Sequence, residues 1–175
     1  MDDAKGLAIA FEEAKISYDE GGIPIGAALI AADGTVLGRG HNMRMQLGNP
    51  ILHVSTPNWM YHTQPGETSA LQNAGRLPAS SYKGATMYTT LSPCDMCTGA
   101  CLLYDIKRVV LGENKTFLGA DGYLKQRGVE VVVLDDEACR GLMEKFIQEK
   151  PDVWNEDIGV EERVYSKEDI KRPSA

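Results

Sequence analysis

The chain has 175 residues, with 18 Lys and Arg against 25 Asp and Glu, which gives a formal net charge of -7 at pH 7. This length suits one domain with a sizeable core. The acidic balance and the lack of a basic cluster argue against nucleic acid as a partner and favour a small neutral substrate. No apolar run reaches the ~18 residues of a membrane span, and the acidic start lacks the basic segment of a signal peptide. We therefore expect a cytosolic protein without a membrane partner, with the nucleus left open as a second compartment.

The first half of the chain predicts a helix, a β-hairpin and a second helix. Residues 7–18 have the apolar spacing of an amphipathic helix, which the glycine pair at 21 and 22 ends. Residues 25–30 and 35–38 predict two strands, because a tight Asp-Gly turn joins them. The second helix is expected over 67–74, where Gly75 ends it.

The second half of the chain alternates strands and helices. The predicted strands are 85–90, 108–111 and 130–134, and the predicted helices are 94–103, 117–126 and 136–149. This order predicts a layered α/β domain, with parallel pairing at least between the last two strands, because one helix links them. We expect a single domain over 1–159. Residues 160–175 are charged with little to bury, and we expect a flexible or surface tail there.

The most informative motif is P-C-x-x-C, formed by Cys94 and Cys97 behind a proline. Thiols at i and i+3 share one helical face, so both can reach one ion, and a first helical turn favours thiolates. Two thiolates and an imidazole leave the fourth position of zinc open for water. A redox pair and two ordinary buried thiols are the alternatives, but the proline and the upstream Glu67 favour zinc. Cys101 and Cys139 are expected to be buried free thiols.

The histidine half of the predicted zinc site is interrupted. His53 is followed by the segment 54–65 and only then by Gly66 and Glu67, so removing that segment restores a His-x-Glu motif. Two prolines, an asparagine and no helical period predict an inserted loop. Three outcomes stay open. The loop leaves His53 on zinc, or His62 replaces it, or the site lacks a histidine and the chain is folded but inactive or weakened.

Glu67 is the predicted proton shuttle. A P-C-x-x-C motif with an upstream His-x-Glu is the signature of zinc-dependent nucleobase deaminases. Such an enzyme needs a carboxylate that takes a proton from water and delivers protons to the ring nitrogen and the leaving amine without binding the metal. The alternative is a glutamate favoured by the helix dipole in a first turn.

The chain resembles fungal-type cytosine deaminase from about Gly6 to Gly159. The segments that carry this resemblance are 21–26, 37–42, 90–99, 112–114 and 154–159, together with the divided His and Glu motif. The resemblance implies a homodimer with a three-layer α/β/α cytidine deaminase-like fold, in which helices flank a central mixed sheet of about five strands. It also implies zinc-dependent hydrolysis of cytosine to uracil and ammonia in pyrimidine salvage.

The same resemblance implies roles for individual residues. Asn42 would hydrogen-bond the pyrimidine edge, and Asp157 would accept from the exocyclic amine. Gly66 and Ser92 would present backbone groups or a hydroxyl to the base. Zinc would be held by His53, Cys94 and Cys97. The pocket would be lined by Ile25, Phe117 and Trp154, the last two covering it.

Two other functions remain open at this point. The first is a non-catalytic or weakened dimeric homologue, which the zinc content of the purified protein would separate from an enzyme. The second is a deaminase of another base, such as guanine or a tRNA adenosine. The acidic charge and the segment 154–159 argue against the tRNA substrate.

Overall fold

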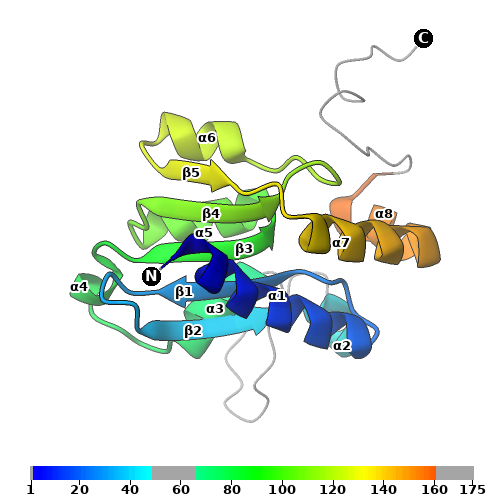
Figure 1. The fold of residues 1–175 in the computed structure, drawn as a ribbon, viewed down its shortest axis with the longest axis horizontal. Helices are drawn as coiled ribbons and strands as arrows, with labels where there is room; N and C mark the ends of the chain where they lie inside the picture. Colours follow the sequence, from blue (N-terminus) through cyan, green and yellow to red (C-terminus); the bar gives the residue numbers. More distant parts are fainter. Residues whose placement is uncertain (1, 49–65, 161–175) are drawn as a thin grey trace.

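A computed structural model describes residues 2–48 and 66–160, which form one five-stranded sheet between helices (Figure 1). The strands are β1 (Gly26–Ile30), β2 (Val36–His41), β3 (Thr86–Leu91), β4 (Arg108–Glu113) and β5 (Glu130–Val133). Their order in the sheet is β2-β1-β3-β4-β5. β1 is antiparallel to β2 and β3, whereas β3, β4 and β5 are parallel. The predicted mixed sheet and the parallel pairing of the last two strands are confirmed.

Helices cover both faces of the sheet. They are α1 (Asp3–Asp19), α2 (Arg44–Leu47), α3 (Gly66–Asn73), α4 (Ala79–Tyr82), α5 (Asp95–Leu103), α6 (Asp121–Gln126), α7 (Glu137–Glu149) and α8 (Pro151–Ile158). Ala10 of α1 packs on one face against Ala28, while Ala70 and Cys101 of α3 and α5 pack on the other against Leu29. α7 lies beside α1 (Figure 1). The three-layer α/β/α prediction is therefore confirmed.

Two glycines bring helices directly onto the hairpin. A Cβ at Gly26 would lie 2.1 Å from the Ala10 carbonyl oxygen, and a Cβ at Gly38 would lie 2.1 Å from that of Ala70. Both distances are far below van der Waals contact, so any side chain at either position would push α1 or α3 off the sheet. The site depends on this close packing, because β1, β2 and α3 all reach it.

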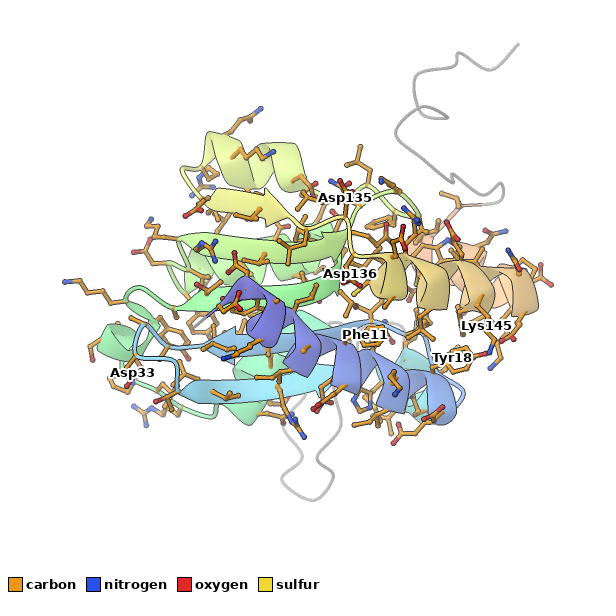
Figure 2. All side chains as sticks on the ribbon, in the orientation of Figure 1. Phe11, Tyr18, Asp33, Asp135, Asp136 and Lys145 are labelled. Atoms are coloured by element: carbon orange, nitrogen blue, oxygen red, sulfur yellow. The ribbon has the colours of Figure 1, made fainter. Side chains whose placement is uncertain are left out.

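α1 and α7 also contact each other through side chains. Lys145 of α7 places its Nζ 4.9 Å from the centre of the Tyr18 ring of α1, and Figure 2 shows the two side chains together. Asp136, also labelled there, caps α7 by accepting a hydrogen bond from the Cys139 backbone N–H at 2.8 Å. The contact between Lys145 and Tyr18 joins α1 to α7 in one layer.

The helix predicted over 117–126 begins later, at Asp121. The preceding residues are held in a loop instead. The Gly119 N–H donates to Ser92 Oγ at 2.9 Å, and the Ala120 N–H donates to the Pro93 carbonyl at 3.2 Å. A tertiary contact with the segment before the cysteines thus overrides the local helical pattern.

Three short helices were not predicted. α2 and α4 have four residues each, too few for a periodic pattern. α8 begins at Pro151, directly after α7, because a proline in the first helical position has no N–H to leave unpaired. Pro151 therefore starts a second helix as well as marking the end of the first.

Several predictions fall outside the described residues. They are the loop 54–65, the histidines at 53 and 62 and nearly all of the tail over 160–175. The single domain over 1–159 stays a prediction for the same reason. In residues 2–48 and 66–160, no helix combines the length and apolar character needed to cross a bilayer.

Candidate active site

The candidate site lies at the edge of the sheet where β2, β3 and β4 end and β1 begins. The antiparallel register brings these ends together, because Gly26 pairs with His41 and Ala27 pairs with Thr89. A cavity of about 470 Å³ opens there. It is lined by Ile25, Asn42, Glu67, Leu91, Ser92, Cys94, Asp95, Met96, Cys97, Phe117, Leu118, Gly119, Trp154, Asp157 and Ile158.

The two predicted thiol ligands lie at the start of α5. Cys94 is the N-cap residue and Cys97 lies in the first turn, so their spacing places both in the cavity wall. A hydrogen bond to Cys94 and burial raise the pKa of Cys97 well above its ordinary value. Cys101 and Cys139 are buried, and none of the four cysteines forms a disulfide.

Glu67 faces the thiols from the first turn of α3. Its side chain is buried, and the Thr89 hydroxyl lies 3.0 Å from Glu67 Oε1. Burial raises the pKa of Glu67 above its ordinary value, and the charge of Cys94 acts in the same direction. A carboxyl with a raised pKa is suited to accepting and returning protons near neutral pH.

This cluster fits a zinc ion. Cys94 raises the pKa of both Cys97 and Glu67, and Glu67 also raises that of Cys97, so a dication is the complementary charge. The two thiols would hold the ion, while Glu67 stands close enough to exchange protons beside it. Across residues 2–48 and 66–160, no three His, Cys, Asp or Glu side chains form a metal site by themselves. His53, the predicted third ligand, and His62, its alternative, lie outside the described residues.

Asn42 and Asp157 both line the cavity. Asn42 follows β2 and is 1% exposed, with its N–H donating to the Ile25 carbonyl at 2.8 Å and its carbonyl accepting from Ser17 Oγ at 2.8 Å. Asp157 lies on α8, where Arg44 Nη1 donates to its Oδ1 at 2.8 Å. The structure therefore brings together the two residues that the resemblance assigns to base recognition.

Ser92 uses its hydroxyl within the protein. The hydroxyl donates to Asp121 and accepts from the Gly119 N–H, and Asn114 Nδ2 donates to the other oxygen of Asp121 at 2.7 Å. Since a hydroxyl has one proton, its proton is already committed to Asp121. The hydroxyl could therefore contact a base only as an acceptor, through its second lone pair, and the backbone of Ser92 is the other group that could do so. Gly66 opens α3, next to Glu67.

Aromatic side chains close the cavity. The rings of Phe117 and Trp154 meet edge to face, with centroids 5.9 Å apart and an interplanar angle of 86°. Trp154 is fully buried, and its indole N–H has no hydrogen-bond partner among the described residues. Ile25 forms a further apolar part of the wall. A flat base in the cavity would therefore contact an apolar cover, in which the Trp154 indole N–H is a donor without a partner among the described residues.

Sequence reasoning missed several residues of the cavity wall and its support. Met96, Leu118 and Ile158 line the cavity. The spacing of Trp154 and Ile158, one helical turn apart, is a signal that could have found Ile158. Arg44 had no such signal, because its partner on α8 is distant in the sequence.

A buried carboxylate beside paired thiols at a helix start, on the edge of a mixed α/β/α sheet, defines a zinc-dependent deaminase of nucleobases or nucleotides. Residues 1–113 match the cytidine and deoxycytidylate deaminase zinc-binding region, and the chain belongs to this family. It is 59% identical over 159 residues to the cytosine deaminase of Candida albicans, covering 91% of this chain and 98% of that protein.

More distant relatives act on other bases. The chain is 32% identical over 151 residues to a tRNA-specific adenosine deaminase of Bacillus subtilis, covering 80% of this chain and 85% of that protein. A solved tRNA:A34 deaminase shares the fold with a TM-score of 0.62 at 24% identity, covering 79% of this chain and 99% of that one. A guanine deaminase from Nitrosomonas europaea also shares the fold, with a TM-score of 0.59 at 20% identity, covering 83% of this chain and 84% of that one.

Proposed function

We propose that the protein is a zinc-dependent cytosine deaminase, which hydrolyses cytosine to uracil and ammonia and serves pyrimidine salvage. The observation that carries this proposal is the buried Glu67 beside Cys94 and Cys97 in a cavity that Asn42 and Asp157 also enter. The identity of 59% to the Candida albicans cytosine deaminase supports cytosine as the base.

The chemistry divides between the metal and Glu67. Zinc, when bound, brings the pKa of a water to about 7 and so supplies hydroxide at neutral pH. Glu67 would accept one proton from the attacking water and deliver it to the ring nitrogen next to the carbon under attack, where a C–O bond forms. Glu67 would then take the second proton of that water from the new hydroxyl and deliver it to the amine nitrogen. The C–N bond would break, the C=O bond of uracil would form, and the nitrogen would depart as ammonia.

Asn42 and Asp157 would orient the base. A carboxylate accepts hydrogen bonds only, so Asp157 suits the exocyclic amine of cytosine. Asn42 accepts the Arg44 backbone N–H through its Oδ1 at 2.9 Å, which leaves its amide nitrogen as the end that can donate to the pyrimidine carbonyl. Phe117 and Trp154 would cover the ring and exclude water.

Substrate assays test the proposed reaction. The purified protein is supplied with zinc and with cytosine, guanine, adenosine or a tRNA, and both ammonia and the base product are measured. We expect uracil from cytosine and no comparable turnover of the other three. The net charge of -7 argues against tRNA binding. Turnover of guanine or tRNA adenosine at a rate equal to that of cytosine would contradict the proposal.

Zinc binding has its own test. We expect about one zinc per chain by elemental analysis, and its loss in Cys94→Ala and Cys97→Ala, because each change removes one thiolate ligand. Cys139→Ala is the matched control, since this buried thiol packs against Gly112 away from the cavity. Equal zinc content in the parent and the three variants would show that Cys94 and Cys97 are not zinc ligands.

We further propose that the protein is a homodimer in the cytosol, with the nucleus as a second compartment. Leu103 is 78% exposed, and Met96 and Tyr104 of the same α5 region are each 43% exposed. Such an exposed apolar group is typical of a surface that a second copy covers. The four free thiols support a reducing compartment.

A further inference from the structure

Arg44 contacts both residues that are proposed to recognise the base. Its backbone N–H donates to Asn42 Oδ1 at 2.9 Å, and its guanidinium Nη1 donates to Asp157 Oδ1 at 2.8 Å. Asn42 follows β2, whereas Asp157 lies on α8 near the end of the described chain. A single arginine thus connects two parts of the cavity wall that are distant in sequence.

The Arg44–Asp157 ion pair is sheltered from water. The Arg44 side chain is 11% exposed and that of Asp157 is 4% exposed, so solvent screens their attraction little. Removing one partner of a buried pair leaves the other charge uncompensated, which is strongly unfavourable. Asp157 must therefore move or take up water when the guanidinium is lost.

The other terminal nitrogen of the Arg44 guanidinium contacts an exposed carboxylate. Arg44 Nη2 donates to Glu156 Oε1 at 3.1 Å, but the Glu156 side chain is 71% exposed. Exposed ion pairs contribute little, because water and salt screen them. Arg44 thus makes one buried contact, with Asp157 in the cavity wall, and one exposed contact, with Glu156. Loss of the exposed contact serves as the control for loss of the buried one.

We infer that Arg44 is a positioning residue for base recognition: its side chain holds the Asp157 carboxylate toward an exocyclic amine, and its backbone N–H orients the amide of Asn42. The inference rests on the proposed function, in which Asp157 accepts from that amine. The two contacts differ in kind. A substitution of Arg44 removes the guanidinium but keeps the backbone N–H, so only the recognition of the amine is lost.

This difference gives a sharp test with two ligands. Cytosine carries both the carbonyl and the amine, whereas pyrimidin-2-one keeps the carbonyl and lacks the amine. Steady-state kinetics give kcat and KM for cytosine, and competition gives the inhibition constant of pyrimidin-2-one. The proteins are the parent, Arg44→Met, Asp157→Ala and the double variant, all with zinc content measured. Glu156→Gln and Arg39→Met are the controls, since Arg39 is an arginine in ion pairs with Glu12 and Glu13.

We expect Arg44→Met to lower kcat/KM for cytosine about 10- to 100-fold, mainly through KM, because a charge-assisted hydrogen bond to the amine is lost. The inhibition constant of pyrimidin-2-one should change by less than about 3-fold, and the zinc content should not change. In the Asp157→Ala background, Arg44→Met should have no further effect, because the arginine acts through that carboxylate. Both controls should match the parent.

Three results would overturn the inference. Equal weakening of both ligands would mean that Arg44 supports the fold and not amine recognition. Additive losses in the double variant would mean that Arg44 does not act through Asp157. An unchanged KM for cytosine in Asp157→Ala would show that Asp157 does not contact the amine. If that variant still produced uracil, the proposed deamination would stand although the inference about Arg44 would fail. Should Arg44→Met fail to fold, Arg44→Lys takes its place, because it keeps the charge but loses the planar fork.

Discussion

Glu67 combines full burial with a raised pKa, and we expect it to be essential for turnover but not for metal binding. Glu67→Gln keeps the shape of the side chain but cannot accept the proton of water, so uracil formation should fall by at least about 10²- to 10⁴-fold. Zinc content, measured on the same sample, should equal that of the parent. Glu12→Gln, at an exposed position, is the control. Loss of zinc in Glu67→Gln would make the carboxylate a ligand.

The sequence is sufficient to name the residues proposed to act on the reacting atoms, but not the residues that the structure places in contact with the proposed site. Cys94, Cys97 and Glu67 follow from helical spacing and from the donor preferences of zinc, both of which are local rules. Arg44 pairs with a residue 113 positions away. Only folding brings the two together. The Ser92 hydroxyl is a similar case, because its partner Asp121 lies on the element after the next strand.

At the scale of elements, His41 connects the end of β2 to α1 and its C-cap through two carboxylates. Its Nδ1 lies 2.7 Å from Glu13 Oε2, and its Nε2 lies 3.3 Å from Glu20 Oε2. Arg39 also contacts Glu13, at 3.0 Å. Burial disfavours the charged imidazole, but the two carboxylates outweigh it, and the pKa of His41 is raised above its ordinary value.

A raised pKa in the folded state makes the contribution of His41 to stability pH-dependent. The contribution is fully present below the unfolded pKa of about 6.5 and is lost as the pH rises through the raised folded value. His41→Gln should therefore lower the melting temperature more at pH 6 than at pH 9. Thermal unfolding of both proteins across this range measures the difference. A constant gap between the two would show that folding leaves the pKa of His41 unchanged.

The segment 54–65 can be tested as a unit. Its deletion joins His53 to Gly66 and Glu67, which restores the spacing that presents a ligand and a proton shuttle from one helix start. Because a misplacement of ~1 Å can cost on the order of 10²-fold in rate, we expect the deletion to increase uracil formation. His53→Ala should abolish activity in both chains, whereas His62→Ala, which can be made only in the full-length chain, should not.

Two outcomes would contradict this prediction. Equal or greater activity in the full-length chain would mean that the segment belongs to an adapted site. Dependence on His62 would give that residue the role of ligand.

Strong periodic patterns predicted the elements, and short or competing ones did not. The hairpin strands follow from the Asp-Gly turn between them, the later strands from short apolar runs, and α1 from its helical apolar spacing. α2 and α4 are single turns, and the start of α6 is displaced by the hydrogen bonds of Gly119 and Ala120. Those bonds connect segments that are far apart in sequence, and no local rule contains them.

The whole molecule is predicted to pair with a second copy through α5. A protein of 19.1 kDa per chain should elute with about twice that mass in light scattering, at micromolar concentration. Leu103→Glu should reduce the mass to that of one chain, because it places a charge in an apolar interface. Val36→Glu is the matched control, since Val36 is 40% exposed on β2. A single-chain mass for the parent would exclude the dimer.

The position of α8 has a consequence for how the protein is made. Trp154, Asp157 and Ile158 are the last residues to join the cavity, and they leave the ribosome after the sheet is complete. A nascent chain released at residue 150 would contain the thiols and Glu67, yet it would lack the cover and the carboxylate proposed to select the base. Translation must therefore run almost to the end of the described chain before the cavity can be complete.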